Sequence, residues 1–313
     1  MRTIEESRKK FDAIRKDMRL PIIAAPMFLV SGPELVTACL SNKIACGFPT
    51  LNARKPEILD DWLANIALDS GLAIPNIIVH RSNPRSQSDL DLIVKHQPPI
   101  VISALGHPGP VLEAVHTYGG LVFADVNSMK HAHKAIEAGI DGLVLVCSGA
   151  GGHTGQLSPF AFIPEVRRVF SGPIIAGGSV SNGFAIRAME LLGADLVSMG
   201  THFISARESL ASDEYRNMLI NSSVEDIIAS PFFTGVQANY LLPSIEKTGI
   251  TKEELIKPRS NVMIDDEKSR AKAWKDIWSA GQGVGSTKAI LPVSKIVSQL
   301  ELEYNLALNG KIK

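Results

Sequence analysis

Residues 142–155 read GLVLVCSGAGGHTG, an apolar run that passes directly into a glycine-rich loop. A short run without a polar face predicts a strand buried on both sides, as in a parallel sheet. Seven more runs of this kind lie within the first 200 residues. The eight predicted strands are Pro21–Ala25, Ile44–Phe48, Leu72–Val79, Ile100–Leu105, Leu121–Asp125, Gly142–Val146, Pro173–Ala176 and Leu196–Met199.

The segments between these strands have apolar residues three and four positions apart and charged residues on the other face, a pattern that predicts helices. Proline in several first turns and glycine after several last residues agree with the usual helix boundaries. The predicted helices are Pro33–Ser41, Pro56–Asp69, Gln87–His96, Gly109–Tyr118, Ser128–Ala138, Phe160–Phe170 and Asn182–Leu192.

Repeated strand–helix units predict parallel strands joined by helical crossovers. Two architectures fit this pattern: an open doubly wound sheet and a closed (β/α)8 TIM barrel. Eight strands without an interrupting second domain favour the barrel, which we expect in residues 1–205. In such barrels, active residues follow the carboxyl ends of the strands.

The last third of the sequence has a different character. No further strands are predicted there, and charged helical patterns occupy Ala206–Leu219 and Glu267–Ser279. Between them, Asn221–Ser244 has the mixed composition of a linker. We expect residues 206–313 to form a mostly helical extension that returns to the barrel and lines the substrate side of its mouth.

The composition of the 313 residues restricts the class of protein. Lys and Arg (32) balance Asp and Glu (32), which argues against nucleic-acid binding through phosphate groups. No apolar run is long enough to span a membrane, and Met1–Lys16 lacks a secretory leader pattern. Cys39, Cys46 and Cys147 are odd in number and lie in apolar contexts, which predicts reduced, buried thiols. We therefore expect a cytoplasmic globular protein.

The loop at residues 149–155 is the first candidate for chemistry. Its four glycines allow the backbone to approach a ligand closely. His153 projects from it, and an imidazole can take or give a proton near neutral pH. A tight surface loop is the alternative, but the position directly after a strand favours a functional role.

Two matched loops follow the seventh and eighth predicted strands, at Ala176–Ser179 and Met199–Thr201. Barrels often bind a phosphate group between the loops at these two positions, through backbone N–H groups. The loops therefore predict a cofactor or substrate that carries a phosphate. Their small and hydroxyl-bearing residues are Gly177, Gly178, Ser179, Gly200 and Thr201.

Two further positions allow two interpretations each. Ala25, Pro26 and Met27 follow the first strand, where a soft thioether could face a flat ring, although ordinary packing is the simpler explanation. Asn76 is a polar amide within an apolar strand and must form hydrogen bonds, either with neighbouring backbone or with a ligand.

The sequence gives no reason to expect a metal site or a nucleophilic hydrolase. His131 and His133 lie two apart on a predicted helix, so they do not face each other. A nucleophile elbow and a Walker A loop are both absent. Four other histidines lack a companion ligand at a suitable spacing, namely His80, His107, His116 and His202.

Four of these segments, in this order, resemble the nitronate monooxygenase family, formerly called 2-nitropropane dioxygenases. The four are Ala25-Pro26-Met27, Gly151-Gly152-His153, Ala176-Gly177-Gly178 and Met199-Gly200-Thr201. The resemblance covers about Leu20–Glu208 and is echoed by Trp278–Gly283. Related flavin-dependent enoyl-acyl-carrier-protein reductases share the Gly-Gly-His loop, so the motifs define the superfamily more closely than the reaction.

The resemblance implies a noncovalently bound FMN and the oxidation of alkyl nitronates, or of nitroalkanes where these are accepted, by molecular oxygen. It places His153 near the reactive face of the flavin as acid and base, with Gln282 approaching from the extension. The flavin phosphate would lie on Gly178, Ser179, Gly200 and Thr201, and its ring over Met27. The other implied cofactor contacts are Ala25, Pro26, Asn76, Asp125, Gly151, Gly152 and Gly177.

Alternatives stay open within the same superfamily. One is an FMN-dependent reductase that uses NAD(P)H to reduce a quinone or an enoyl thioester, and another is a barrel that binds FMN without catalysis. Use of NAD(P)H and assembly into a homodimer are undecided. Two positions depart from the family pattern: Gly149 replaces an acidic residue of many relatives, and Asp125-Val126-Asn127 lacks a lysine found in some.

Overall fold

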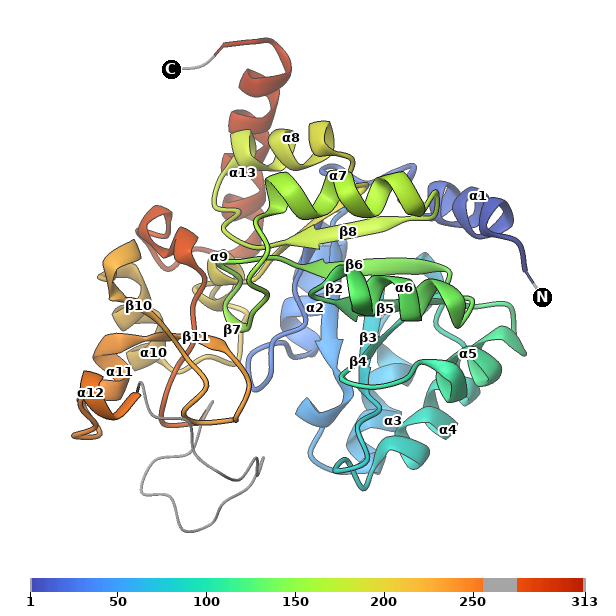
Figure 1. Ribbon diagram of the computed structural model, residues 1–313, viewed down its shortest axis with the longest axis horizontal. Coiled ribbons are helices and arrows are strands. Elements are labelled where there is room, and N and C mark those ends of the chain that lie inside the picture. The colour runs from blue at the N-terminus through green and yellow to red at the C-terminus, as the bar shows by residue number, and fades with distance from the viewer. Residues whose placement is uncertain (1, 256–274, 312–313) are drawn as a thin grey trace.

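The computed structural model describes residues 2–255 and 275–311, and its main feature is a closed barrel of eight parallel strands (Figure 1). β1 pairs with both β2 and β9, which closes the barrel and excludes the open sheet. Each predicted strand is found within one or two residues of its expected bounds. The barrel strands are β1 (Ile22–Ala24), β2 (Ala45–Pro49), β3 (Ala73–Ile78), β4 (Ile100–Ala104), β5 (Leu121–Val126), β6 (Gly142–Val146), β8 (Ile174–Gly177) and β9 (Leu196–Met199).

The seven predicted crossover helices are also present. The second of them, predicted as Pro56–Asp69, differs most, because the chain becomes extended at Ile66 and then forms a separate short turn, η2 (Leu68–Ser70). A second short turn, η1 (Thr50–Asn52), follows β2. The crossover helices are α2 (Pro33–Ser41), α3 (Pro56–Asn65), α4 (Ser86–His96), α5 (Gly109–His116), α6 (Met129–Glu137), α7 (Pro159–Val169) and α8 (Gly183–Leu192).

An additional helix, α1 (Ile4–Arg15), lies at the amino-terminal end of the barrel (Figure 1). A capping box between Thr3 and Glu6 begins this helix. Its Phe11 side chain is fully buried in the cluster that fills the barrel, with its ring 5.5 Å from that of Phe123. We did not predict α1, because one buried aromatic residue among charges leaves little apolar periodicity.

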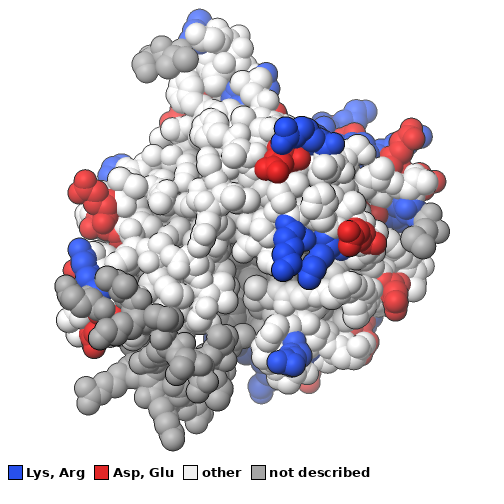
Figure 2. All heavy atoms as spheres, viewed as in Figure 1, with Lys and Arg blue, Asp and Glu red and all other residues white. Residues whose placement is uncertain are grey.

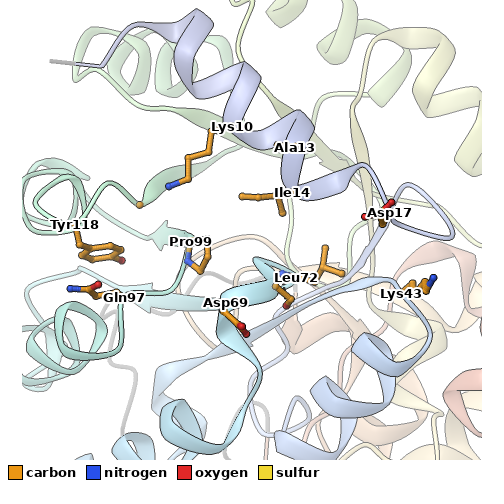
Figure 3. Close-up of a pocket in the computed structure, with 12 residues that line it drawn as sticks. Lys10, Ala13, Ile14, Asp17, Lys43, Asp69, Leu72, Gln97, Pro99 and Tyr118 are labelled. Atoms are coloured by element: carbon orange, nitrogen blue, oxygen red, sulfur yellow. Dashed lines mark hydrogen bonds between the residues drawn. The ribbon is translucent and has the colours of Figure 1, made fainter.

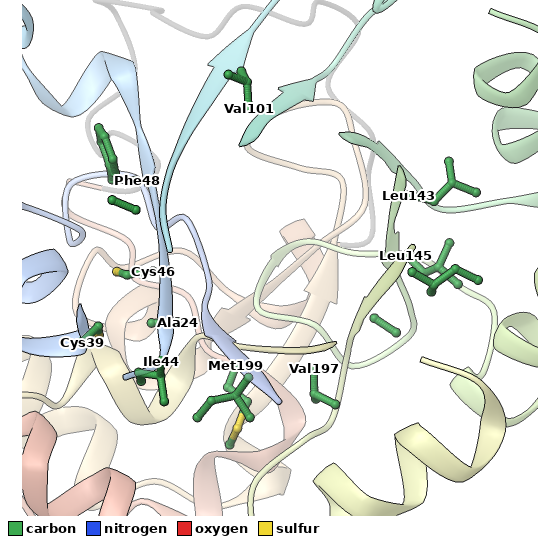
Figure 4. Close-up of a cluster of buried hydrophobic side chains, with 14 of the residues drawn as sticks. Ala24, Cys39, Ile44, Cys46, Phe48, Val101, Leu143, Leu145, Val197 and Met199 are labelled. Atoms are coloured by element: carbon green, nitrogen blue, oxygen red, sulfur yellow. The ribbon is translucent and has the colours of Figure 1, made fainter. Parts of the chain in front are cut away.

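Side chains alternate between the inside and the outside of the barrel. Those that point outward form the larger core with the surrounding helices, as Phe48, Leu145 and Val197 show (Figure 4). Cys39 of α2 and Cys46 of β2 belong to this layer (Figure 4). All three cysteines are buried and none forms a disulfide bond, which confirms the prediction of buried, free thiols.

The prediction that strands are absent after residue 201 is wrong. β10 (Ile227–Ser230) and β11 (Ala238–Leu241) form an antiparallel sheet with β7 (Gly152–His153), in the order β10-β11-β7. The region treated as a linker therefore supplies two strands. Their partners lie far apart in the sequence, so local composition did not reveal them.

The predicted helix Ala206–Leu219 is shorter than expected. It is α10 (Asp213–Ile220), whose start is fixed by Ser212 as its N-cap. The other predicted helix, Glu267–Ser279, lies mostly outside the described residues, and 275–279 are not helical. The remaining elements are α9 (Thr201–Ile204), η3 (Val224–Asp226), α11 (Leu242–Glu246), α12 (Lys252–Leu255), η4 (Gln282–Ser286) and α13 (Val293–Leu308).

The last helix, α13, returns to the barrel and packs on α8 (Figure 1). The Glu303 carboxylate accepts a hydrogen bond from Gly183 N at 2.9 Å, and Tyr304 donates to Glu190 at 2.7 Å. A side chain at Gly183 would collide with the α13 backbone, so this glycine allows the close contact. The extension is thus fixed to the barrel at its far end.

The surface of the described residues carries both signs of charge. On the face in Figure 2 the charged side chains are interspersed, and uncharged residues cover most of the area. Within the described residues, no helix is both long and apolar enough to cross a membrane.

A cleft of about 660 Å³ lies at the amino-terminal end of the barrel, beside α1. Lys10 and Ile14 of α1 face Leu72, Pro99 and Tyr118 across it (Figure 3). Leu72 precedes β3, Pro99 precedes β4 and Tyr118 precedes β5. The cleft therefore lies at the opposite end of the barrel from the strand ends that carry the predicted site. None of the predicted site residues lines it.

Candidate active site

Four loops meet at the carboxyl-terminal end of the barrel. They follow β6, β8 and β9, and the fourth comes from the extension at residues 280–287, which we call the closing segment. Gln282 N donates to Gly149 O at 3.0 Å, and Gly281 N donates to Thr201 Oγ1 at 3.0 Å. Ser179 Oγ lies 3.4 Å from Gln282 Oε1. The structure thus brings together predicted site residues from all four loops.

The loops after β8 and β9 contain backbone N–H groups that are not needed as hydrogen-bond donors within the described residues. Those of Gly178, Ser179, Gly200 and Thr201 donate no hydrogen bond to any residue that the structure describes. Unused donors that cluster at strand ends are the usual means by which barrels hold a phosphate group. This arrangement fits the predicted phosphate.

The turn after β8 has an unusual backbone. Gly178 has φ +136°, and Ser179, which is not a glycine, follows with φ +59°. Such conformations persist only where the surroundings enforce them, and they are common at ligand sites. Here the Ser179 hydroxyl also lies 3.3 Å from Ser148 O, which joins the turn to the loop after β6.

Gly149 has a structural reason to be glycine. Its φ is +78°, and a Cβ atom there would lie 1.9 Å from Ser179 Oγ and 2.8 Å from Gln282 Oε1. An acidic side chain, as in many relatives, would require these two neighbours to move. Glycine at this position therefore allows Gln282 of the closing segment to lie close to the loop after β6.

The loop after β1 borders the same region. A Cβ atom at Gly200 would lie 3.5 Å from Met27 Sδ and 3.7 Å from the Ala25 side chain, which is ordinary van der Waals contact. Pro26 packs against Gly47 instead, where a Cβ atom would come within 2.8 Å of the proline ring. Met27 thus faces the predicted phosphate loops, whereas Pro26 contacts a neighbouring strand.

Asn76 and Asp125 occupy interior positions near the ends of β3 and β5. Each lies two residues after Ile74 or Phe123, on the same face of its strand, and these two residues belong to the cluster inside the barrel. The Asn76 side chain is 8% exposed and forms no hydrogen bond with any described residue. The Asn76 amide therefore does not form the hydrogen bond to neighbouring backbone that was the alternative interpretation, and it is available to a ligand.

Asp125 accepts one hydrogen bond, from Leu105 N at 3.3 Å. Burial raises the pKa of its carboxyl from 3.8 to about 6. No Lys or Arg among the described residues forms an ion pair with it. The stretch Asp125-Val126-Asn127, which lacks the lysine of the family resemblance, therefore contains a carboxyl with a raised pKa.

This raised pKa predicts the stability of an Asp125→Asn variant. Between pH 3.8 and 6 the folded chain holds the proton more tightly than the unfolded chain, so stability falls as the pH rises through this window. We expect Asp125→Asn to raise the free energy of unfolding by about 1–2 kcal/mol at pH 8 and not at pH 3.5. Denaturant titrations at both pH values measure this difference. The exposed Asp69→Asn is the control, and an equal change at both pH values would contradict the assignment.

His153 is held by the small sheet of the extension. It pairs with Ala238 of β11, and its Nε2 lies 3.1 Å from Thr234 Oγ1. Burial lowers the pKa of its imidazole below the ordinary value of 6.5, so the ring is neutral at neutral pH. A neutral imidazole at a strand end is suited to accept a proton.

Sequence reasoning missed several residues of this region. Gly281 lies within the quoted segment Trp278–Gly283, but its bond to Thr201 was not expected. Asn239 Nδ2 donates to Ala150 O at 2.7 Å and so supports the glycine loop, while Thr234 contacts His153. Thr234 and Asn239 lie in the stretch treated as a linker, and no local pattern marked them.

Several of the other histidines have structural partners. His116 pairs with Asp141 at 2.8 Å, and His202 Nδ1 lies 2.9 Å from Thr287 Oγ1. The His202 contact ties the closing segment to α9, and burial lowers the pKa of its ring to about 4. Within the described residues, no three His, Cys, Asp or Glu side chains are grouped as metal ligands would be.

Comparison with known proteins gives the family. The family model described as nitronate monooxygenase matches residues 51–303. The chain belongs to this family.

A curated relative carries the same family description, and two solved structures share the fold. "Probable nitronate monooxygenase" of Staphylococcus aureus is 31% identical over 157 residues, which are 47% of this chain and 44% of the relative. The chain thus matches about half the length of that relative. FabK from Thermotoga maritima has a TM-score of 0.78 at 21% identity, covering 97% of this chain and 99% of that one. Nitroalkane oxidase from Streptomyces ansochromogenes has a TM-score of 0.75 at 18% identity, with coverage of 95% and 99%. At these identities, the two structures support the barrel fold.

Proposed function

We propose that the chain binds FMN and uses it to oxidise alkyl nitronates, and neutral nitroalkanes where these are accepted, with molecular oxygen. The main support is the set of unused N–H groups on the loops after β8 and β9, beside a glycine loop that ends in a neutral imidazole. Family membership and the names of the relative and of the nitroalkane oxidase point to the same substrates.

In this proposal the chain's own residues hold the cofactor at both ends. Gly178, Ser179, Gly200 and Thr201 hold the phosphate, with Gly177 shaping the end of β8. When bound, FMN supplies an acceptor for the electrons of the substrate and a means of passing them to oxygen. The other residues proposed to contact it are Ala25, Pro26, Met27, Asn76, Asp125, Gly151, Gly152 and Gln282.

His153 acts as acid and base on the substrate. A neutral nitroalkane must lose the proton on its α-carbon before oxidation, and the neutral imidazole takes that proton. The electron pair of the broken C–H bond stays on the substrate, which becomes a nitronate. A preformed nitronate has already lost this proton, so it needs His153 only for positioning.

We also propose that the chain divides near residue 205 into two parts with different roles. Residues 1–205 would form the barrel that binds FMN, and residues 206–313 would line the substrate side of its mouth. The support for this division is that β11 and Thr234 of the extension hold His153, while the closing segment contacts Gly149 and Thr201.

The visible absorption spectrum under anaerobic conditions tests the function. We expect purified protein reconstituted with FMN to lose flavin absorbance when a short alkyl nitronate is added, and to regain it on exposure to oxygen. Rapid loss of absorbance with NADH or NADPH, without any response to nitronates, would instead support a reductase of quinones or enoyl thioesters. Uptake of FMN without any response to nitronates, NADH or NADPH would support a barrel that binds FMN without catalysis, and failure to take up FMN would contradict the proposal.

A further inference from the structure

Two polar side chains lie across the mouth of the barrel from the phosphate loops. The closed order of strands places β3 and β4 opposite β8 and β9, and β5 is the next strand after β4. Asn76 is in β3 and Asp125 is in β5, and both face the inside of the barrel. In the proposed function, a cofactor held by its phosphate at β8 and β9 would therefore extend across the mouth toward these two side chains.

The Asp125 carboxyl has one oxygen left for a ligand. The side chain is partly exposed, and its Oδ1 accepts a hydrogen bond from Leu105 N at 3.3 Å. Leu105 has φ +58°, a left-handed conformation that is uncommon outside glycine and that persists only where the surroundings enforce it. Among the described residues, no other residue donates a hydrogen bond to this carboxyl or forms an ion pair with it. Oδ2 is therefore free to meet a bound molecule.

The surroundings of Asp125 leave its charge uncompensated. Its neighbouring strands are β4 and β6, and in the loops that follow them His107 is exposed, the pKa of Cys147 is raised to about 12 and the pKa of His153 is lowered. The thiol and the His153 imidazole are therefore uncharged at neutral pH, and the basic residues 130–131 after β5 are exposed on α6. Within the described chain, no charged side chain shifts the pKa of Asp125, which burial raises to about 6. The charge on this carboxyl therefore depends on what lies in the mouth.

We propose that Asp125 takes up one proton from water when the bound flavin is reduced, and that this proton offsets the negative charge that reduction adds to the ring. The inference rests on the proposed function, in which the flavin accepts electrons from the substrate. The nitronate is oxidised and the flavin is reduced, while the proton forms an O–H bond on Oδ2 of Asp125. When oxygen takes the electrons, the flavin is oxidised again and the proton returns to water.

Electrostatics gives the direction of this coupling. A negative charge close to a carboxyl raises its pKa, because it disfavours a second negative charge. Without such a charge in the mouth, the pKa of Asp125 is about 6, so the carboxyl is ionised at pH 8. Reduction raises this pKa, and the carboxyl gains its proton wherever the pH lies between the two values. Below pH 6 the proton is already present, so reduction brings no uptake.

Redox titration of the flavin-reconstituted full chain at pH 5.5, 7 and 8.5 tests this coupling without any substrate. The matched variant is Asp125→Asn, whose amide can still accept from Leu105 N but stays neutral at every pH. Relative to this variant, the equilibrium constant for reduction of the parent should fall by up to about 10-fold for each pH unit above 6, as one coupled proton requires. The exposed Asp69→Asn should follow the parent. An equal ratio of parent to Asp125→Asn at all three pH values would overturn the proposal.

Infrared difference spectra between the oxidised and the reduced protein follow the proton itself. At pH 8 we expect the carbonyl band of a protonated carboxylic acid to appear on reduction of the parent, and to be missing in Asp125→Asn. Asp125→Leu, which also lacks the carboxyl, replaces the asparagine variant if that variant does not fold. A parent that binds and reduces FMN without this band contradicts the coupling alone. A chain that takes up no FMN contradicts the proposed function and, with it, the coupling.

Discussion

Replacing His153 by asparagine is expected to lower the turnover of neutral nitroalkanes by about 10²- to 10⁴-fold, the usual contribution of a general base. Turnover of the preformed nitronates should change by only a few-fold, because these substrates have already lost the α-proton. FMN uptake should be unchanged, since His153 takes no part in the phosphate loops. Initial rates with a nitroalkane and its own nitronate, measured on one preparation, give the comparison.

The matched control is His133→Asn, which removes an exposed imidazole from α6. Its rates with both substrates should equal those of the parent. Acidification provides a second test, because protonation of His153 removes the base and lowers the rate with neutral nitroalkanes. Burial lowers the pKa of His153, so this loss should set in below the ordinary value of 6.5. Equal losses with both substrates in the asparagine variant would mean that His153 has another role.

Replacing Gly178 by valine is expected to weaken FMN binding by at least about 100-fold. A Cβ atom there would lie 2.6 Å from Ser148 O and 3.0 Å from the Cys147 side chain, and φ is +136°. The loops after β6 and β8 would have to separate, which would displace the N–H donors. Loss of two hydrogen bonds to a charged group costs about 3–6 kcal/mol, which corresponds to the expected change in affinity. Titration of the flavin-free protein with FMN, followed by flavin fluorescence, measures it.

Two other glycines separate the causes of this effect. Gly139 also has a positive φ (+84°) but open space around it, so Gly139→Val tests the backbone strain alone. Gly285 has open space and no positive φ, so Gly285→Val should be neutral even though it lies in the closing segment. We expect both variants to bind FMN as the parent does. Parent-like binding by Gly178→Val would contradict the phosphate site.

The barrel could be predicted from the sequence because each of its strands has an apolar pattern that is visible within a few residues. The run at Gly142–Val146 has no polar side chain and precedes a glycine loop, and the strands at Ile174–Gly177 and Leu196–Met199 are mostly apolar and also lead into glycines. The loops after these strands could be found for the same reason. In contrast, α1 buries mainly Phe11 and Ser7, too few residues to produce a periodic pattern.

The parts of the site that were missed depend on contacts between distant segments. β11 is a strand because it pairs with β10 and β7, and Gly152–His153 would read as loop without that pairing. Thr234 and Asn239 acquire their roles only through groups more than 80 residues away. The local sequence of a short polar stretch does not indicate which distant segment it will contact. The stretch was therefore predicted to be a linker, which is wrong.

The closing segment has a consequence for how quickly the cofactor would exchange. It reaches from the glycine loop after β6 to the phosphate loop after β9, bonded to Gly149 through Gln282 N and to Thr201 through Gly281 N. Its further anchor is the contact between Thr287 and His202. A cofactor beneath it would depart only after these bonds open, so its residence time should be set by the extension, while the equilibrium affinity depends on the loops of the barrel.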